Sequence, residues 1–108
     1  MGDDRITAVA LLHRIDAGTA PPILDVRSRS EYRHGHVPGA RHIPFWLLPR
    51  RIDQVPGRRD VELVVYCGHG PRASVAGTIL KRSGFTRVVY LDGHYSHWRN
   101  AGLREERE

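Results

Sequence analysis

A strand that leads through a tight turn directly into a helix, over residues 61–83, restricts the fold more than any other part of the chain. The apolar run at 62–67 predicts a buried strand that ends at Cys67, and residues 72–83 form the clearest helical pattern. Two glycines and a proline between these segments are typical of a turn. A strand followed at once by a helix is characteristic of α/β folds built around a parallel sheet.

The remaining segments continue this alternation of strands and helices. Strands are expected at 23–27, 41–43 and 88–91, a helix at 6–15 capped by Thr7, a single helical turn within 28–34, and further helices at 45–48, continuing over 50–54, and at 94–101 with Trp98 facing inward. The helix at 72–83 is expected to bury Val75, Ala76, Ile79 and Leu80 on one face. We therefore predict an α/β fold with a mainly parallel central sheet of about five short strands flanked by helices.

The length of 108 residues predicts one domain, with a core over about 6–103 and a charged tail at 104–108. The composition is ordinary for a soluble globular protein, with 40% hydrophobic and 27% charged residues. No apolar run is long enough to span a membrane, and the N-terminal residues 1–4 lack the pattern of a secretion signal. Because one cysteine cannot form an internal disulfide, we expect a reducing, cytoplasmic location.

The chain is basic, with a formal net charge of +5, sixteen arginines and a single lysine. The arginines are scattered, and no basic run is interleaved with aromatic residues as in many nucleic-acid interfaces. We therefore expect a surface that attracts small anions, and no nucleic-acid or membrane partner. The close histidine pairs at 34/36 and 94/97 lack a cysteine or carboxylate that would complete a metal site, so none is expected.

Cys67 is the only cysteine, and it occupies the end of the predicted central strand. There, Gly68 and Gly70 permit a turn in which several backbone N–H groups converge on the sulfur, next to a helix N-terminus that favours an anion. Such surroundings stabilise a thiolate, the nucleophilic form of cysteine, whereas the alternative is a buried structural cysteine. Arg72 suits the oxygens of a bound oxyanion, and His69 is either a further donor or a solvated turn residue.

Several short motifs, taken in their order along the chain, resemble those of the rhodanese family of single-domain sulfurtransferases. They are Leu24-Asp25-Val26-Arg27, Glu31-Tyr32, Gly35-His36-Val37-Pro38-Gly39-Ala40, Ile43-Pro44, Val65-Tyr66-Cys67 with the loop to Arg72, Leu91-Asp92-Gly93, Trp98 and Ala101-Gly102. The resemblance covers about 6–103 and implies a three-layer rhodanese-like fold. The sequence departs from the family at His94, where a second glycine commonly follows Asp-Gly, and this departure bears most on acceptor preference.

The resemblance implies a thiosulfate sulfurtransferase that acts through a persulfide on Cys67 and needs no metal or organic cofactor. A sulfane sulfur would pass from thiosulfate or a related donor to Cys67, and then to cyanide, a thiol or a protein acceptor. The implied site consists of the nucleophile Cys67 and an anion-binding loop formed by Gly68, His69, Gly70, Pro71, Arg72 and Ala73. The implied supporting residues are Asp25, Arg27, Asp92 and Gly93, together with Glu31 and His36. The natural donor, the natural acceptor and the oligomeric state stay open.

Two other functions are also open. The first is a non-catalytic rhodanese-like module that binds a partner or senses a signal, although such members usually lack the cysteine or the loop pattern. The second is a cysteine-dependent phosphatase or arsenate reductase, whose related loops resemble C-x5-R. Here four residues separate Cys67 from Arg72, and this shorter C-x4-R loop favours sulfur chemistry.

Overall fold

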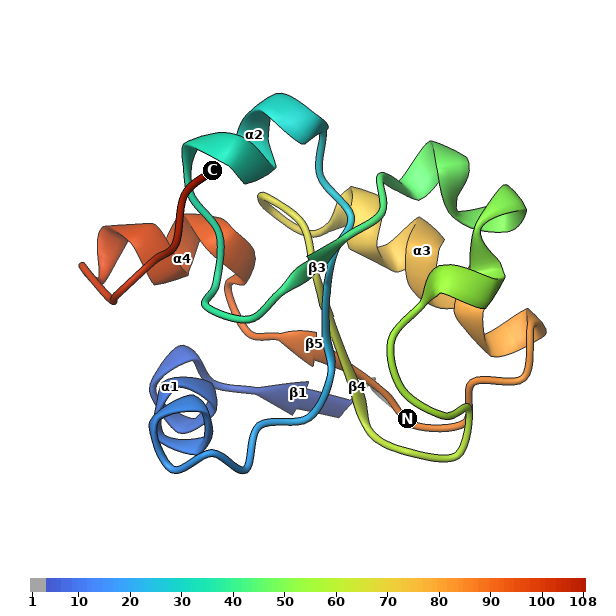
Figure 1. The fold of residues 1–108 in the computed structure, drawn as a ribbon, viewed down its shortest axis with the longest axis horizontal. Coiled ribbons are helices and arrows are strands. Elements are labelled where there is room, and N and C mark those ends of the chain that lie inside the picture. The colour runs from blue at the N-terminus through green and yellow to red at the C-terminus, as the bar shows by residue number, and fades with distance from the viewer. Residues whose placement is uncertain (1–3) are drawn as a thin grey trace.

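The structure, a computed structural model, describes residues 4–108. Its elements are β1 (Asp4–Ile6), α1 (Ala8–Asp16), β2 (Ile23–Asp25), α2 (Arg29–His34), β3 (Arg41–His42), the 3₁₀ helices η1 (Phe45–Arg50) and η2 (Ile52–Gln54), β4 (Leu63–Tyr66), α3 (Pro71–Arg82), β5 (Val88–Leu91) and α4 (His94–Asn100) (Figure 1). The absence of a secretion signal was predicted from residues 1–4, and residues 1–3 lie outside the described residues. Between residues 4 and 108, every helix is too short or too polar to cross a lipid bilayer.

The five strands form one parallel sheet in the order β1-β5-β4-β2-β3. All residues of β2 and β4 are buried, as expected for central parallel strands that are covered on both faces. From β2 the chain continues to β3 on one side, whereas β4 and β5 lie on the other side. Ligands of open α/β sheets bind outside the carboxyl ends of the strands at such a reversal, and Cys67 directly follows β4.

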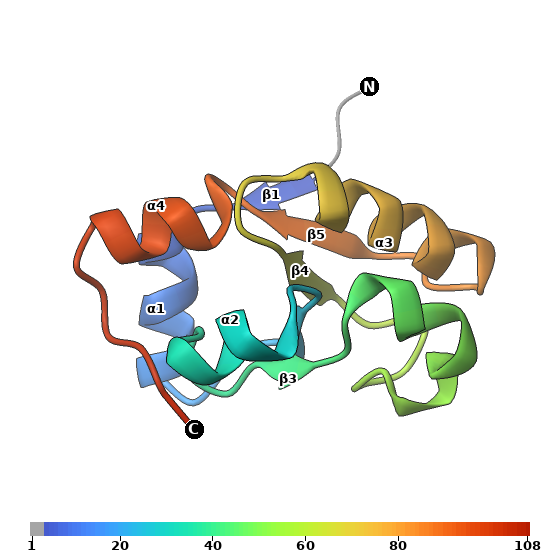
Figure 2. The ribbon, with the colours of Figure 1, turned by 90° about the horizontal axis from the view of Figure 1, so that it is seen from above.

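Helices cover both faces of the sheet, as Figure 2 shows for α3 on one side and for α1 and α4 on the other. One buried cluster contains Val65, Leu80 of α3 and Leu48 of η1. The second cluster contains Leu11 of α1 and Trp98 of α4, which is fully buried as predicted. The predicted three-layer α/β fold with about five parallel strands is therefore confirmed.

Side-chain caps explain where two of the helices begin. Thr7, the predicted N-cap of the first helix, accepts a hydrogen bond from the amide of Ala10 at 3.1 Å. At α2, the side chain of Ser28 accepts from the amide of Glu31 at 3.3 Å, while the Glu31 carboxylate accepts from the amide of Ser28 at 3.1 Å. This reciprocal capping box stabilises a helix in a polar segment for which only one turn was predicted.

Two predictions about the elements are wrong. The first helix does not start at Ile6, because residues 4–6 form β1, which pairs in parallel with β5. Val75 is not buried on α3 but is 49% exposed, whereas Ala76 and Leu80 are buried as predicted, together with Ala73 and Gly77. The reason lies at Gly77, where α3 approaches Tyr90 so closely that a Cβ atom would collide with the phenol.

The charged segment 104–108 packs against the domain. The indole of Trp98 donates to the carbonyl of Arg104 at 2.9 Å, and the hydroxyl of Tyr95 donates to the carboxylate of Glu105. The backbones of His36 and Glu106 exchange two hydrogen bonds of 2.9 Å each. These contacts hold the C-terminal segment beside α4 and the turn that follows α2.

Candidate functional site

Three of the predicted site segments meet at the carboxyl edge of the sheet. Cys67 follows β4, Arg27 follows the neighbouring strand β2, and Asp92 follows β5 on the other side. After Cys67, residues 68–70 turn the chain into α3, which begins at Pro71. Proline suits this first helical position because its missing N–H would have no partner within the helix. Ala73 is buried in the same first turn.

The sulfur of Cys67 accepts a hydrogen bond from the amide of Gly70 at 3.0 Å. Gly70 has a φ of +136°, a conformation that residues with a Cβ atom rarely adopt, and its amide points back at the sulfur. Among the described residues no second amide donates to this sulfur, so the predicted convergence of several N–H groups is reduced to one. Cys67 is 0% exposed, and a donor molecule therefore reaches it only after neighbouring groups move.

The N-terminus of α4 holds the other end of the loop. The amide of Tyr95 donates to the carbonyl of Cys67 at 3.0 Å, and the amide of Ser96 donates to the carbonyl of Gly68 at 3.1 Å. The first amides of a helix have no partner within the helix, and here two of them bind the loop. In addition, Nδ1 of His94 accepts from the amide of Cys67 at 3.2 Å. The loop is thus attached to α4 at Cys67 and Gly68.

Arg72 is paired with a carboxylate in this structure. Its Nη1 and Nη2 atoms donate to the two oxygens of Glu31 at 2.6 and 3.0 Å. The hydrogen bonds to Arg72 lower the pKa of Glu31 from 4.5 to about 2, and the capping contacts with Ser28 act in the same direction. The pKa of Arg72 is raised, first by its hydrogen bonds to Glu31, then by the charges of Glu31 and Cys67. Arg72 therefore lies within electrostatic reach of the sulfur, with its guanidinium engaged by Glu31.

Asp25 and Arg27 form a buried ion pair below the site. Nη2 of Arg27 donates to Oδ2 of Asp25 at 2.7 Å and to the carbonyl of Gly35 at 2.6 Å. The Asp25 side chain is 0% exposed and that of Arg27 is 5% exposed. The guanidinium also stacks on the ring of Tyr95, with its carbon 4.1 Å from the ring centroid. The pair thereby connects the end of β2 to the turn after α2 and to α4.

A cavity of about 480 Å³ borders the loop on the side of β5. Its lining includes His69, Gly70 and Pro71 of the loop region, Asp92, Gly93 and His94 of the turn after β5, and also Arg5, Ser74 and Tyr90. Five of the predicted site residues therefore share this cavity, while Cys67 does not line it. The Asp92 carboxylate lies 3.6 Å from the guanidinium of Arg5, so the cavity carries charges of both signs.

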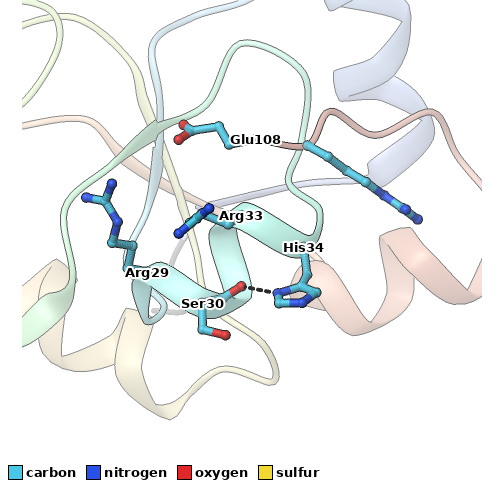
Figure 3. Close-up of a pocket in the computed structure, with 6 residues that line it drawn as sticks. Arg29, Ser30, Arg33, His34 and Glu108 are labelled. Carbon is cyan, nitrogen blue, oxygen red and sulfur yellow. Dashed lines mark hydrogen bonds between the residues drawn. The ribbon is translucent and has the colours of Figure 1, made fainter.

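A second cavity, of about 550 Å³, lies over α2 and is lined by Arg29, Ser30, Arg33, His34, Arg107 and Glu108. Figure 3 shows Arg29, Arg33 and His34 projecting from α2, with Nδ1 of His34 donating to the carbonyl of Ser30 at 2.7 Å. None of the predicted loop or supporting residues lines this cavity. It is a basic depression that Cys67 does not line.

The histidines near α2 serve local structure. Nδ1 of His36 donates to the carbonyl of Tyr32 at 2.8 Å, and the two rings stack with centroids 3.7 Å apart. Across residues 4–108, no group of three or more His, Cys, Asp or Glu side chains is arranged to hold a metal ion.

Some residues of the site could not be found from the sequence. Arg5, Ser74 and Tyr90 line the cavity beside the loop, but no motif or spacing distinguishes them. Glu31 was expected only to support the site, and its direct pairing with Arg72 was not foreseen. A signal for its position did exist, because Ser28 and Glu31 have the spacing of a capping box.

Known proteins share both the sequence and the fold of this chain. A sulfurtransferase of Allochromatium vinosum is 36% identical over 81 residues, which cover 75% of this chain and 74% of that protein. The thiosulfate sulfurtransferase GlpE of Stutzerimonas stutzeri is 35% identical over 72% of this chain and 70% of its own length. The HTH-type transcriptional regulator Rv0324 of Mycobacterium tuberculosis is 38% identical over 94% of this chain, which spans only 44% of that regulator.

A solved structure and a family profile agree with these relatives. The crystal structure of the Alr3790 protein from Anabaena sp. superimposes with a TM-score of 0.84 at 30% identity, over 95% of this chain and 82% of that one. The model of the Rhodanese-like domain family matches residues 7–101, which is most of the chain. The parallel sheet, the loop after β4 and these similarities lead to one conclusion: the chain belongs to the rhodanese-like domain family.

Proposed function

We propose that this protein is a sulfurtransferase that carries a sulfane sulfur on Cys67 as a persulfide. The observation that carries the proposal is the hydrogen bond of 3.0 Å from the Gly70 amide to the Cys67 sulfur, at the carboxyl end of β4. A donor aimed at the sulfur favours its negatively charged form, which is the reactive nucleophile. The positive charge of Arg72 acts on the same sulfur. Sulfurtransferase relatives at 35–36% identity support the same class of reaction.

The reaction has two halves, with thiosulfate as the donor. The Cys67 thiolate attacks the outer sulfur of thiosulfate, a new S–S bond forms, and the old S–S bond breaks with its electron pair leaving on sulfite. The acceptor, cyanide or a thiolate, then attacks the outer sulfur of the persulfide, and Cys67 leaves as the thiolate. No electron is exchanged with a cofactor in either half.

Binding of the donor requires a change in the surroundings of Cys67, because the residue is fully buried. The Glu31–Arg72 pair lies next to the loop, since a Cβ atom on Gly68 would be 3.0 Å from Nη2 of Arg72 and 3.8 Å from a Glu31 oxygen. We propose that the donor's oxygens replace Glu31 as the partner of Arg72. A planar guanidinium suits a sulfur oxyanion as well as a carboxylate. This exchange would bring the donor to the sulfur and neutralise its charge.

Small sulfur-containing anions are the proposed donors, and a small thiol or a protein thiol is the proposed acceptor. A reducing compartment keeps the Cys67 thiol reduced and available as the nucleophile, so we propose a cytoplasmic location.

Intact-mass measurement after incubation with thiosulfate tests the covalent step. The expected product is a single adduct of about 32 Da, lost again on addition of cyanide together with release of thiocyanate. The variant Cys67→Ser is the control, and it is expected to form neither adduct nor thiocyanate. Absence of the adduct after rapid trapping, or full activity of Cys67→Ser, would contradict the proposal.

The burial of Cys67 favours a second candidate, a module that binds a partner without catalysis. The similarity to an HTH-type transcriptional regulator over 94% of this chain is compatible with that role. The same mass experiment separates the two candidates. A module that only binds a partner would form no adduct with thiosulfate, whereas an enzyme would form the adduct and release its sulfur to cyanide over repeated turnovers.

A further inference from the structure

His94 occupies an unusual backbone conformation next to the loop. Its φ is +53°, in the left-handed region, and it is the one non-glycine residue among residues 4–108 with a positive φ. A residue with a Cβ atom adopts this conformation at a cost that other contacts must offset. His94 is also 7% exposed, at the start of α4. Contacts with neighbouring residues must therefore stabilise this conformation.

The imidazole of His94 binds the loop at Cys67 and lies beside Gly70. Its Nδ1 accepts from the amide of Cys67 at 3.2 Å. Its Nε2 and Cδ2 atoms lie 3.5 and 3.7 Å from the point that a Cβ atom on Gly70 would occupy. Gly70 is the residue whose amide donates to the Cys67 sulfur. The ring therefore binds Cys67 and lies beside Gly70. The relative position of these two residues determines the hydrogen bond from the Gly70 amide to the sulfur.

The contact with Cys67 requires a particular protonation state. A backbone amide can only donate, so Nδ1 must present its lone pair, and the neutral ring then carries its proton on Nε2. A protonated ring has N–H groups on both nitrogens, and an N–H at Nδ1 would oppose the amide of Cys67. Burial lowers the pKa of His94 below 6.5, and the charge of Arg5 lowers it further. The folded state thus favours the ring that can accept.

The charged and titratable groups around the ring come from several elements. Arg5 on β1 disfavours the protonated ring, whereas Asp92 after β5 favours it. His69 of the loop and Tyr90 of β5 line the same cavity. The hydrogen bonds from the amides of residues 95 and 96 to the loop do not titrate, so they keep α4 against the loop when the ring is protonated. Protonation would therefore disturb the Cys67 amide locally.

We propose that His94 is a positioning residue that fixes the Cys67 amide, beside Gly70, only while its imidazole is neutral. For its effect on sulfur transfer this inference rests on the proposed function, but the structural part stands without it. The loop is held in the geometry described here at neutral pH and above. As the pH falls through the titration of His94, the hydrogen bond to Cys67 is lost and the geometry around the sulfur relaxes.

NMR of ¹⁵N-labelled protein from about pH 8 to about pH 5 tests the structural part. In the unaltered protein, His94 is expected to be the neutral Nε2–H tautomer at the upper end. The Cys67 amide is expected to shift with the same midpoint as the ring, below 6.5. An Nδ1–H tautomer at neutral pH, or a Cys67 amide that stays unchanged while His94 titrates, would overturn the proposal.

Variants extend the test to activity. Asparagine tolerates the left-handed region and offers a non-titrating oxygen acceptor, so His94→Asn should keep the Cys67 amide bond but lose its pH dependence. The control His97→Asn changes an exposed histidine of the same helix. In this variant the signal of the Cys67 amide should depend on pH as it does in the unaltered protein. Activity is measured with thiosulfate and cyanide for both proteins. The activity of His94→Asn divided by that of the unaltered protein should rise about threefold or more as the pH falls from about 8 to about 5. A constant ratio would refute the catalytic part alone, and absence of any activity would refute the proposed function while leaving the NMR result intact.

Discussion

The guanidinium of Arg72 donates two hydrogen bonds to the carboxylate of Glu31, across 41 positions of the chain, at 2.6 and 3.0 Å. The same carboxylate accepts from the amide and the hydroxyl of Ser28. One side chain therefore closes the first turn of α2 and engages the cation beside Cys67. Any change in this pair should affect both the stability of the domain and the access of an anion to the loop.

The stability effect of Glu31 depends on pH. Because the pKa of Glu31 is lowered to about 2 in the folded state, its stabilising contribution is complete above its unfolded value of 4.5 and is lost as the pH falls toward 2. Glu31→Gln keeps a capping side chain but removes the charge. The variant should unfold at lower urea concentration than the unaltered protein at neutral pH, and the two midpoints should approach each other in acid. A difference that persists at the acid end would contradict this assignment.

The same substitution should change the binding of the donor. Without the carboxylate, Arg72 loses its ion pair with Glu31, and the negative charge of Glu31 no longer repels an incoming anion. We expect Glu31→Gln to lower the KM for thiosulfate by about threefold to tenfold, with a smaller change in kcat. Steady-state kinetics at low ionic strength measure this. A raised KM would indicate instead that Glu31 orients Arg72 for binding.

The buried pair of Asp25 and Arg27 should matter more for stability than an exposed pair of the same type. Asp25→Asn leaves a cation without its partner at a site that is almost completely buried, and such a loss typically costs about 3–5 kcal/mol. Asp60→Asn is the matched control, because Asp60 pairs with Arg58 where the two side chains are 67% and 81% exposed. Urea unfolding should show a large loss for Asp25→Asn and no measurable change for Asp60→Asn. Equal effects would mean that the buried pair is not a brace.

The sequence predicts most reliably those elements that depend only on residues nearby in the chain. β5 was predicted at the residues where it is found, because a run of four buried apolar residues is recognisable without knowledge of its neighbours. The Thr7 cap was predicted for the same reason. By contrast, β1 is a short strand of mostly exposed residues, and only its pairing with β5 makes it a strand. Its existence depends on a partner more than 80 residues away.

The incorrect and missing parts of the site have similar causes. Apolar spacing placed Val75 on the inner face of α3, but the glycine at 77 permits a closer approach to Tyr90, and the buried face includes Gly77 and leaves out Val75. A hydrophobicity pattern assigns no packing role to glycine. Likewise, the loop sequence indicates that Arg72 lies near a thiol. Its ion pair with Glu31, by contrast, depends on the position of α2 relative to the loop.

The conformation of Gly70 leads to the sharpest test of the loop. An alanine at this position would strain the backbone at a φ of +136°, although its Cβ atom would meet only His94 at ordinary contact distances of 3.5 and 3.7 Å. The expected relief is a rotation of the peptide that carries the amide away from the Cys67 sulfur. Gly70→Ala should therefore fold, and should form the persulfide from thiosulfate at least about tenfold more slowly.

Gly18→Ala is the matched control for backbone strain. Gly18 has a φ of +74°, and nothing lies within 4 Å of the added Cβ atom. It follows α1, away from Cys67, so its substitution should lower stability without slowing persulfide formation. Rates of adduct formation followed by intact mass, corrected for the folded fraction of each variant, compare the two. If both variants formed the adduct at the rate of the unaltered protein, the Gly70 amide would have no part in activating the sulfur.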